Sequence, residues 1–135
     1  MRLREPNRIL RSIHNMQCIV RNSSRGTVLA EHVAIANTLV TRLRGLLGTD
    51  TLPAQHGLLI EPCRQVHTYF MRYALDLVFI DRDRRVLHAV PDMRPGRVSP
   101  HVRGADAVLE LPAGTLAAIP VGPGDQLVVE PRTPL

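Results

Sequence analysis

Short apolar runs, most of them alternating with polar residues, recur along this chain between groups of turn-forming residues. An alternation with a period of two residues is typical of a β-strand that buries one face. Gly, Pro, Asn, Asp and Ser dominate the intervening groups, and each of these residue types favours a tight turn. The spacing predicts an all-β fold, an antiparallel jelly-roll-like sandwich or barrel, rather than alternating strands and helices.

The expected strands cover, in chain order, residues 16–21, 27–35, 57–60, 66–80, 86–90, 107–111 and 127–130. The 66–80 segment is much longer than an average strand of about five or six residues, so we expect a bend or bulge near 71–74. Leu77 to Ile80 is apolar on both faces, which predicts a central strand that is covered on both sides. Cys18 alternates with Met16 and Val20, so we expect its thiol in the core.

One segment has the period of a helix rather than that of a strand. Its apolar residues recur on one helical face: Leu39, Val40, Leu43, Leu46 and Leu47. Asn37 is an expected N-cap and Gly48 an expected C-terminal residue. The sequence therefore predicts one short amphipathic helix over residues 38–47.

The 135 residues are enough for one domain, which we place at 16–131 with a tail at 132–135. Residues 1–15 read as a basic disordered arm, and the start itself is a candidate over-extension, because Met16 opens a strand pattern. The longest apolar run of this arm is Ile9-Leu10, shorter than a signal peptide requires. No run reaches the ~18 apolar residues of a membrane helix, so we expect a soluble, cytoplasmic protein.

Five short motifs stand in a characteristic order: Arg42-x-Arg44-Gly45-Leu46-Leu47-Gly48, Gly57-Leu58-Leu59, Asp76-Leu-Val-Phe-Ile80-Asp81, Val108-Leu109-Glu110-Leu111-x-x-Gly114 and Gly124-Asp125. Over residues 27–130 the chain resembles the family of domain of unknown function 192. The resemblance implies a compact jelly-roll-like sandwich with a short helix, and it implies no activity.

The chain departs from many members of that family just before Asp76. Those relatives carry an aromatic-Met-Lys-Asn stretch, whereas residues 63–72 here read CRQVHTYFMR, as in a His-Thr branch of the family. A function inferred for the aromatic-Met-Lys form does not transfer to this chain. Some relatives also look secreted and carry leader peptides.

Metal and nucleophile chemistry receive little support from the sequence. Cys63 and His67 are four residues apart, a spacing that on a strand separates them by about 13 Å. A zinc ion, with ligands at ~2.0–2.3 Å, cannot bridge that distance, and the same separation argues against a thiolate–imidazole pair. No serine lies in a Gly-x-Ser-x-Gly elbow. We expect no metal and no cofactor.

The strongest polar candidates lie on and around the 66–80 segment. Thr68, Arg72 and Asp76 share one parity, opposite the apolar row, and His67 adjoins them. Arg94 and Arg97 occupy a long Pro- and Gly-rich loop at 91–105, a kind of loop that is often functional.

Two hypotheses use these residues. In the first, a non-enzymatic module binds a small anionic ligand or a protein partner through the 91–105 loop and the edge near 64–76, with Arg44 and Glu110 as further candidates. In the second, an enzyme uses an acid–base site built from His67, Arg72, Asp76 and Glu110. A structural alternative remains open: Arg72 paired with Asp76 or Glu110, Glu110 paired with Arg44 or solvated, and His67 in the core.

The sequence disfavours nucleic acid as a partner. All 17 cationic residues are Arg, but the net charge is only +5, of which +3 falls within residues 1–15. The Phe and Tyr residues gather within 69–79 and follow the apolar row, away from the arginines. A nucleic-acid surface needs basic and aromatic residues together on one accessible face.

Overall fold

The computed structural model describes residues 17–36, 51–69 and 71–132. The expected basic arm at 1–15, the expected helix at 38–47 with its flanking Asn37 and Gly48, and residues 133–135 of the expected tail lie outside these ranges. Arg44 and Phe70 also lie outside them.

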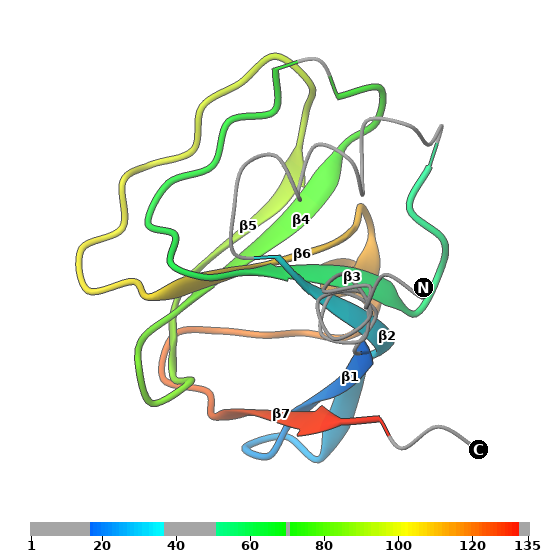
Figure 1. Cartoon of the computed structure of the whole chain (residues 1–135), viewed down its shortest axis with the longest axis vertical. Coiled ribbons are helices and arrows are strands. Elements are labelled where there is room, and N and C mark those ends of the chain that lie inside the picture. Colours follow the sequence, from blue (N-terminus) through cyan, green and yellow to red (C-terminus); the bar gives the residue numbers. More distant parts are fainter. Residues whose placement is uncertain (1–16, 37–50, 70, 133–135) are drawn as a thin grey trace, which may run out of the picture.

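The described chain is all-β, with seven strands in one curled sheet and one short helix (Figure 1). The strands are β1 (Gln17–Asn22), β2 (Thr27–Ala36), β3 (His56–Ile60), β4 (Leu75–Ile80), β5 (Val86–Met93), β6 (Ala107–Pro112) and β7 (Leu127–Pro131), and the helix is α3 (Thr115–Ala118). Their order across the sheet is β5-β4-β6-β3-β2-β1-β7, and the sheet bends into a half-barrel. The all-β prediction is confirmed.

The sheet is mixed, because β2 and β3 pair in parallel from His32 opposite His56 to Ala36 opposite Ile60. The remaining ladders are antiparallel. A parallel connection needs a dozen or more residues, and the segment 37–55 between these strands is long enough to provide it. The sequence predicts antiparallel pairing, and the structure departs from it at this one pair.

The core lies on both faces of the sheet, and β4 is buried along its whole length. Val78 and Ile80 pack with Leu109 in one apolar cluster, whereas Leu77 and Phe79 belong to a second. The expected doubly covered strand is confirmed, because Leu77 to Ile80 are fully buried. Cys18 is also buried in the core as expected, and burial raises the pKa of its thiol.

The two edge strands of the sheet meet at one corner. Val86 N, where β5 begins, donates to Asp125 O at 2.8 Å, and Leu127 N, where β7 begins, donates to Arg84 O at 2.9 Å. An ion pair between Arg84 and Glu61 ties the same loop to the end of β3. The half-barrel is thus closed by main-chain hydrogen bonds at this corner.

The sheet does not include residues 66–74. The break expected near 71–74 is present, and β4 begins only at Leu75. Tyr69, which the apolar alternation assigned to the buried row, is 46% exposed. The alternation cannot be extended backward across the break because the backbone on its other side is not part of the same strand.

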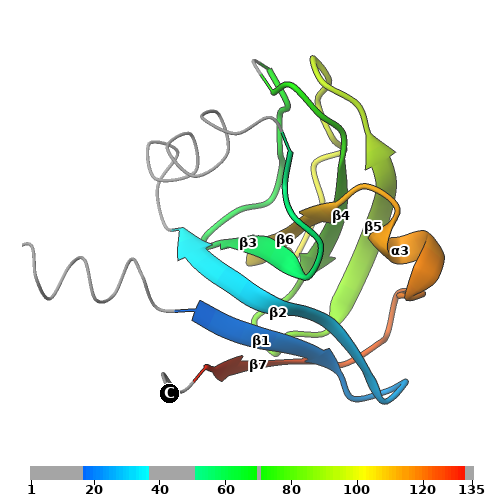
Figure 2. The same cartoon turned by 90° about the vertical axis from the view of Figure 1, so that its right-hand side faces the viewer.

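Helix α3 lies between the predicted strands 107–111 and 127–130, where the sequence predicts no helix. Gly114 adopts a φ of 94°, a conformation that favours glycine, and the helix follows it directly. Four residues are too few for an apolar helical period to become visible in the sequence. Figure 2 shows α3 beside β5, on the side of the sheet away from β1.

Candidate functional site

Two segments distant in sequence, 63–69 and 94–106, lie antiparallel beside each other; we call this pair the ribbon (Figure 1). Backbone hydrogen bonds join them at intervals: Thr68 N to Arg97 O at 2.8 Å, Ser99 N to Val66 O at 2.8 Å, Val102 N to Arg64 O at 2.9 Å and Cys63 N to Asp106 O at 3.0 Å. The ribbon unites the two regions that the sequence proposed as a binding edge.

Thr68 fixes the tip of the ribbon. Its side chain is fully buried, and its Oγ1 donates to Arg94 O at 2.6 Å while accepting from Arg97 N at 3.0 Å. Thr68 O accepts from Gly96 N at 2.9 Å, which closes the turn. Thr68 therefore positions the backbone that carries Arg94 and Arg97, and its hydroxyl both donates and accepts within the fold.

The outer face of the ribbon carries rings and apolar side chains. The His67 and Tyr69 rings stack with their centroids 5.2 Å apart and an interplanar angle of 26°. Val98 pairs with His67 across the ribbon and is 49% exposed. Among the described residues, Tyr69 and Val98 are the exposed large hydrophobic side chains, and both lie here. The Nδ1 atom of His67 is buried and lacks a hydrogen-bond partner within the described ranges.

Positive charge is concentrated on the ribbon. The ribbon carries four exposed arginines, Arg64, Arg94, Arg97 and Arg103. Together with the carboxylate of Asp106 they give the ribbon a formal charge of +3. The rest of the described chain has seven Arg against nine Asp and Glu, a formal charge of −2. Arg94 lies 3.7 Å from the exposed carboxylate of Asp92, whereas the other three form no ion pair with described residues.

Asp76 serves the backbone. Its Oδ1 accepts from Asp92 N and its Oδ2 from Leu116 N, each at 2.8 Å. This carboxylate thus ties β4 to the end of β5 and to α3. Both acceptor atoms are occupied inside the fold, and the residue is buried.

Glu110 and Asp76 point to opposite faces of the sheet. Asp76 is opposite Leu111 in the β4–β6 ladder, and Glu110 is opposite Leu77, one position along. Leu111 and Leu77 belong to different apolar clusters, and Glu110 is fully buried. The described structure therefore does not assemble the four residues of the acid–base hypothesis into one site. Arg72 is exposed in the segment that leads into β4.

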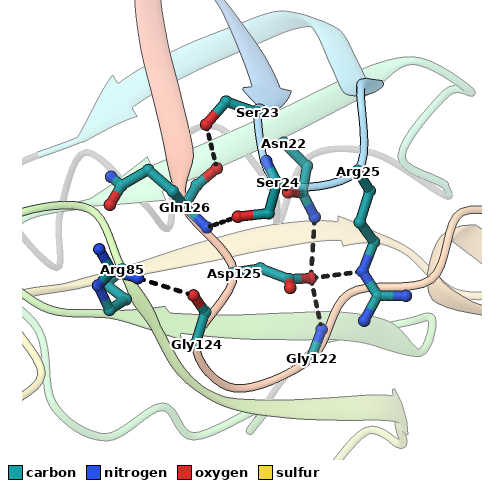
Figure 3. Close-up of polar contacts among 9 residues, drawn as sticks. All are labelled: Asn22, Ser23, Ser24, Arg25, Arg85, Gly122, Gly124, Asp125 and Gln126. Atoms are coloured by element: carbon teal, nitrogen blue, oxygen red, sulfur yellow. Dashed lines mark hydrogen bonds and ion pairs between the residues drawn. The ribbon is translucent and has the colours of Figure 1, made fainter.

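A second polar cluster surrounds Asp125 and is structural (Figure 3). The Asp125 Oδ2 atom accepts hydrogen bonds from Gly122 N at 3.0 Å, Asn22 Nδ2 at 3.0 Å and Arg25 Nε at 2.7 Å. These contacts lower the pKa of Asp125, with the Gly122 amide as the largest cause. Arg85 Nη1 donates to Gly124 O at 2.9 Å on the same loop. The cluster joins the β1–β2 turn to the segment before β7.

An open cleft of about 440 Å³ lies between β5 and the segment that follows β6. It is lined by His88, Ala89, Pro91, Leu116, Ala117, Pro120, Val121 and Pro123. None of these side chains is a carboxylate, a guanidinium or a hydroxyl, so the cleft is apolar except for one imidazole.

The described residues contain no group of three or more His, Cys, Asp and Glu side chains that could hold a metal ion. Cys18 and Cys63 are free thiols. Within the same ranges, no helix has the length and apolar character needed to span a membrane.

The sequence pattern of one family, described as Uncharacterized ACR, matches residues 20–129, most of the chain. The chain belongs to the DUF192 family. Two relatives carry the name UPF0127 protein. The relative from Thermococcus sibiricus is 29% identical over 114 residues, which cover 78% of this chain and 71% of that protein. The relative from Thermococcus gammatolerans is 28% identical over 113 residues, covering 79% and 72%.

Two crystal structures share the DUF192 fold seen here. A putative transcription regulator from Sinorhizobium meliloti superposes with a TM-score of 0.69 at 24% identity, covering 84% of this chain and 92% of that one. A protein of unknown function from Novosphingobium aromaticivorans gives a TM-score of 0.69 at 24% identity, covering 83% of each chain. At this identity the likeness establishes the fold alone.

For this DUF192 chain, the structure brings four of the predicted site residues together on the ribbon: His67, Thr68, Arg94 and Arg97. Sequence reasoning missed Tyr69 and Val98 as surface residues and Arg64 as part of the basic group. The Pro and Gly content of 91–105 was the available signal that the neighbouring backbone leaves the sheet.

Proposed function

We propose that this chain is a non-enzymatic β module that binds an anionic ligand or partner through the ribbon. The observation that carries the proposal is the separation of charge: +3 on the ribbon against −2 on the rest of the described chain. A local positive field raises the local concentration of anions and speeds their association, which a small net charge alone does not do.

The exposure of the ribbon's arginines to solvent supports the same proposal. Arg64, Arg97 and Arg103 are exposed and form no ion pair with described residues, so their guanidinium groups do not serve to balance neighbouring carboxylates. Arginine presents five N–H donors in a planar fork that suits carboxylate and phosphate groups. Thr68 holds the backbone of two of the ribbon's arginines in place, which lowers the entropic cost of binding.

Heparin affinity chromatography tests the proposal with a polyanion of known chemistry. We expect Arg97→Glu and Arg103→Glu to lower the salt concentration at which the protein elutes. The matched control is Arg82→Glu, which makes the same charge change at an exposed position in the β4–β5 loop. Equal effects at all three positions would show that net charge, not the ribbon, governs binding, and the proposal would fail.

A further inference from the structure

The ribbon combines its basic side chains with an accessible aromatic surface. Tyr69 is held against the His67 ring and remains 46% exposed, and Val98 lies across from His67. An exposed aromatic ring together with basic side chains is the combination on which single-stranded nucleic acids stack their bases and bind their phosphates. We infer that the ribbon binds single-stranded nucleic acid, an inference that rests on the proposed function and specifies its partner.

The stacked rings favour a nucleic acid over an acidic polypeptide. An acidic peptide offers carboxylates to the arginines but has no need of a rigid aromatic platform. Unpaired bases stack on such platforms, at about 1–3 kcal/mol for each base. The stack of His67 under Tyr69 holds the tyrosine ring in one orientation before a base arrives.

The arginines are spaced so that they contact more than one phosphate. At the tip of the ribbon the backbone of Arg97 is hydrogen-bonded to that of Thr68. Farther from the tip, the backbone of Arg64 is hydrogen-bonded to that of Val102, the neighbour of Arg103. Residues 64 and 68 are about 13 Å apart along an extended backbone. Val98 lies within that span and Tyr69 directly follows it. Basic and apolar side chains thus occur on the same short ribbon, as expected where a nucleic-acid backbone follows a basic surface while its bases stack.

The sequence-based argument against nucleic acid had two premises, the small net charge of the chain and the burial of its aromatic residues. The ribbon alone carries a formal charge of +3, so its local charge is larger than the net value suggests. The second premise is the burial of the aromatic residues. That premise fails for Tyr69, because β4 begins only at Leu75 and the tyrosine lies outside the sheet. Exposed aromatic and basic side chains consequently occur together on the ribbon.

Fluorescence anisotropy with a labelled 12-nucleotide oligo(dT) tests the inference on the full chain. We expect Tyr69→Ala to weaken binding roughly 5- to 150-fold, the equivalent of one lost base stack. Tyr69→Phe keeps the ring and should bind as the wild type does. Arg97→Ala should reduce the slope of log Kd against log salt by about 0.7, the value for one phosphate contact on a single strand. Arg82→Ala, off the ribbon, should leave affinity and slope unchanged. Far-UV circular dichroism of each variant confirms the fold.

Three further probes define what overturns the inference. Tighter binding of a labelled 12-residue oligo-glutamate, unaffected by Tyr69→Ala, shows that the partner is an acidic polypeptide; the proposed function survives and the nucleic-acid inference does not. Tighter binding of a 12-base-pair duplex rules out recognition of unpaired bases. Absence of binding to all three probes, together with heparin elution that does not change in Arg97→Glu, overturns both proposals.

Discussion

Removal of the Asp125 carboxylate is the sharpest test of how the fold is held together. Its Oδ2 atom collects three hydrogen bonds, and one donor, the Asn22 amide, belongs to a fully buried residue. A buried donor without an acceptor costs about 1–3 kcal/mol, and the bond from the Gly122 amide is worth about 1 kcal/mol. The pair with Arg25, which is exposed, adds at most about 1 kcal/mol. We therefore expect Asp125→Ala to lower the free energy of unfolding by about 3 kcal/mol.

The variant Asp125→Asn removes the negative charge of the side chain but keeps an oxygen that accepts hydrogen bonds. An amide oxygen at the same position keeps the three hydrogen bonds in neutral form, so we expect a loss of about 1–2 kcal/mol at neutral pH. The pKa of Asp125 is lowered in the folded state, from an ordinary value of 3.8. The stabilisation by its charge is therefore fully present above that ordinary value and is lost as the pH falls through the folded-state pKa. The difference in the free energy of unfolding between the wild type and Asp125→Asn should therefore disappear as the pH is lowered below about 4.

Urea unfolding followed by far-UV circular dichroism at pH 7 and pH 3 provides both measurements, since the chain has no Trp to report unfolding. Asp83→Asn is the matched control: its exposed side chain has no hydrogen-bond or ion-pair partner among the described residues. A loss below about 0.5 kcal/mol in Asp125→Ala, as is usual for surface changes, would refute the reasoning. The reasoning would also be refuted if the free energies of unfolding of the wild type and Asp125→Asn differed by the same amount at both pH values.

Further substitutions test the remaining structural assignments. Gly57→Ala places a Cβ 3.0 Å from the Glu110 carbonyl oxygen in the middle of the sheet, and thermal unfolding should show a loss of about 1–3 kcal/mol; an unchanged melting temperature contradicts the packing described. Thr68→Val should cost about 1–3 kcal/mol and speed amide exchange at Arg97, measured by hydrogen exchange; unaltered protection there contradicts its role at the ribbon tip. Asp76→Asn turns an amide N–H₂ toward one of two backbone donors, and urea unfolding should show a loss of about 2–3 kcal/mol; a neutral result argues against its structural role.

Much of the fold could be predicted because the alternation of apolar and polar residues along a strand shows directly which side chains are buried. The continuous apolar run at Leu77 to Ile80 identified a strand that is buried on both faces, and the phase of Cys18 identified the buried face of β1. The parallel pairing of β2 with β3 was missed because local pattern carries no information about which strand is the neighbour. Helix α3 was missed because four residues contain little more than one helical turn.

The candidate site was predicted only in part, for a related reason. The cations and the loop were visible in the sequence, so Arg94 and Arg97 were identified. Tyr69 was assigned to the core by carrying the alternation of β4 backward, which is valid only while the backbone stays in one strand. The change of direction before Leu75 depends on pairing with residues some thirty positions away, which local propensity does not encode.

The corner where β5 meets the start of β7 constrains when folding can be completed during synthesis. Among the described strands, β7 is made last and pairs with β1, which is made first, from Cys18 opposite Pro131 to Asn22 opposite Leu127. Until residues 124–131 leave the ribosome, β1 keeps an unpaired edge and the place of Leu127 in the core stays empty. Contacts over such sequence separations slow folding and leave an open edge exposed to aggregation. The sheet is therefore completed late, once the whole of β7 is available.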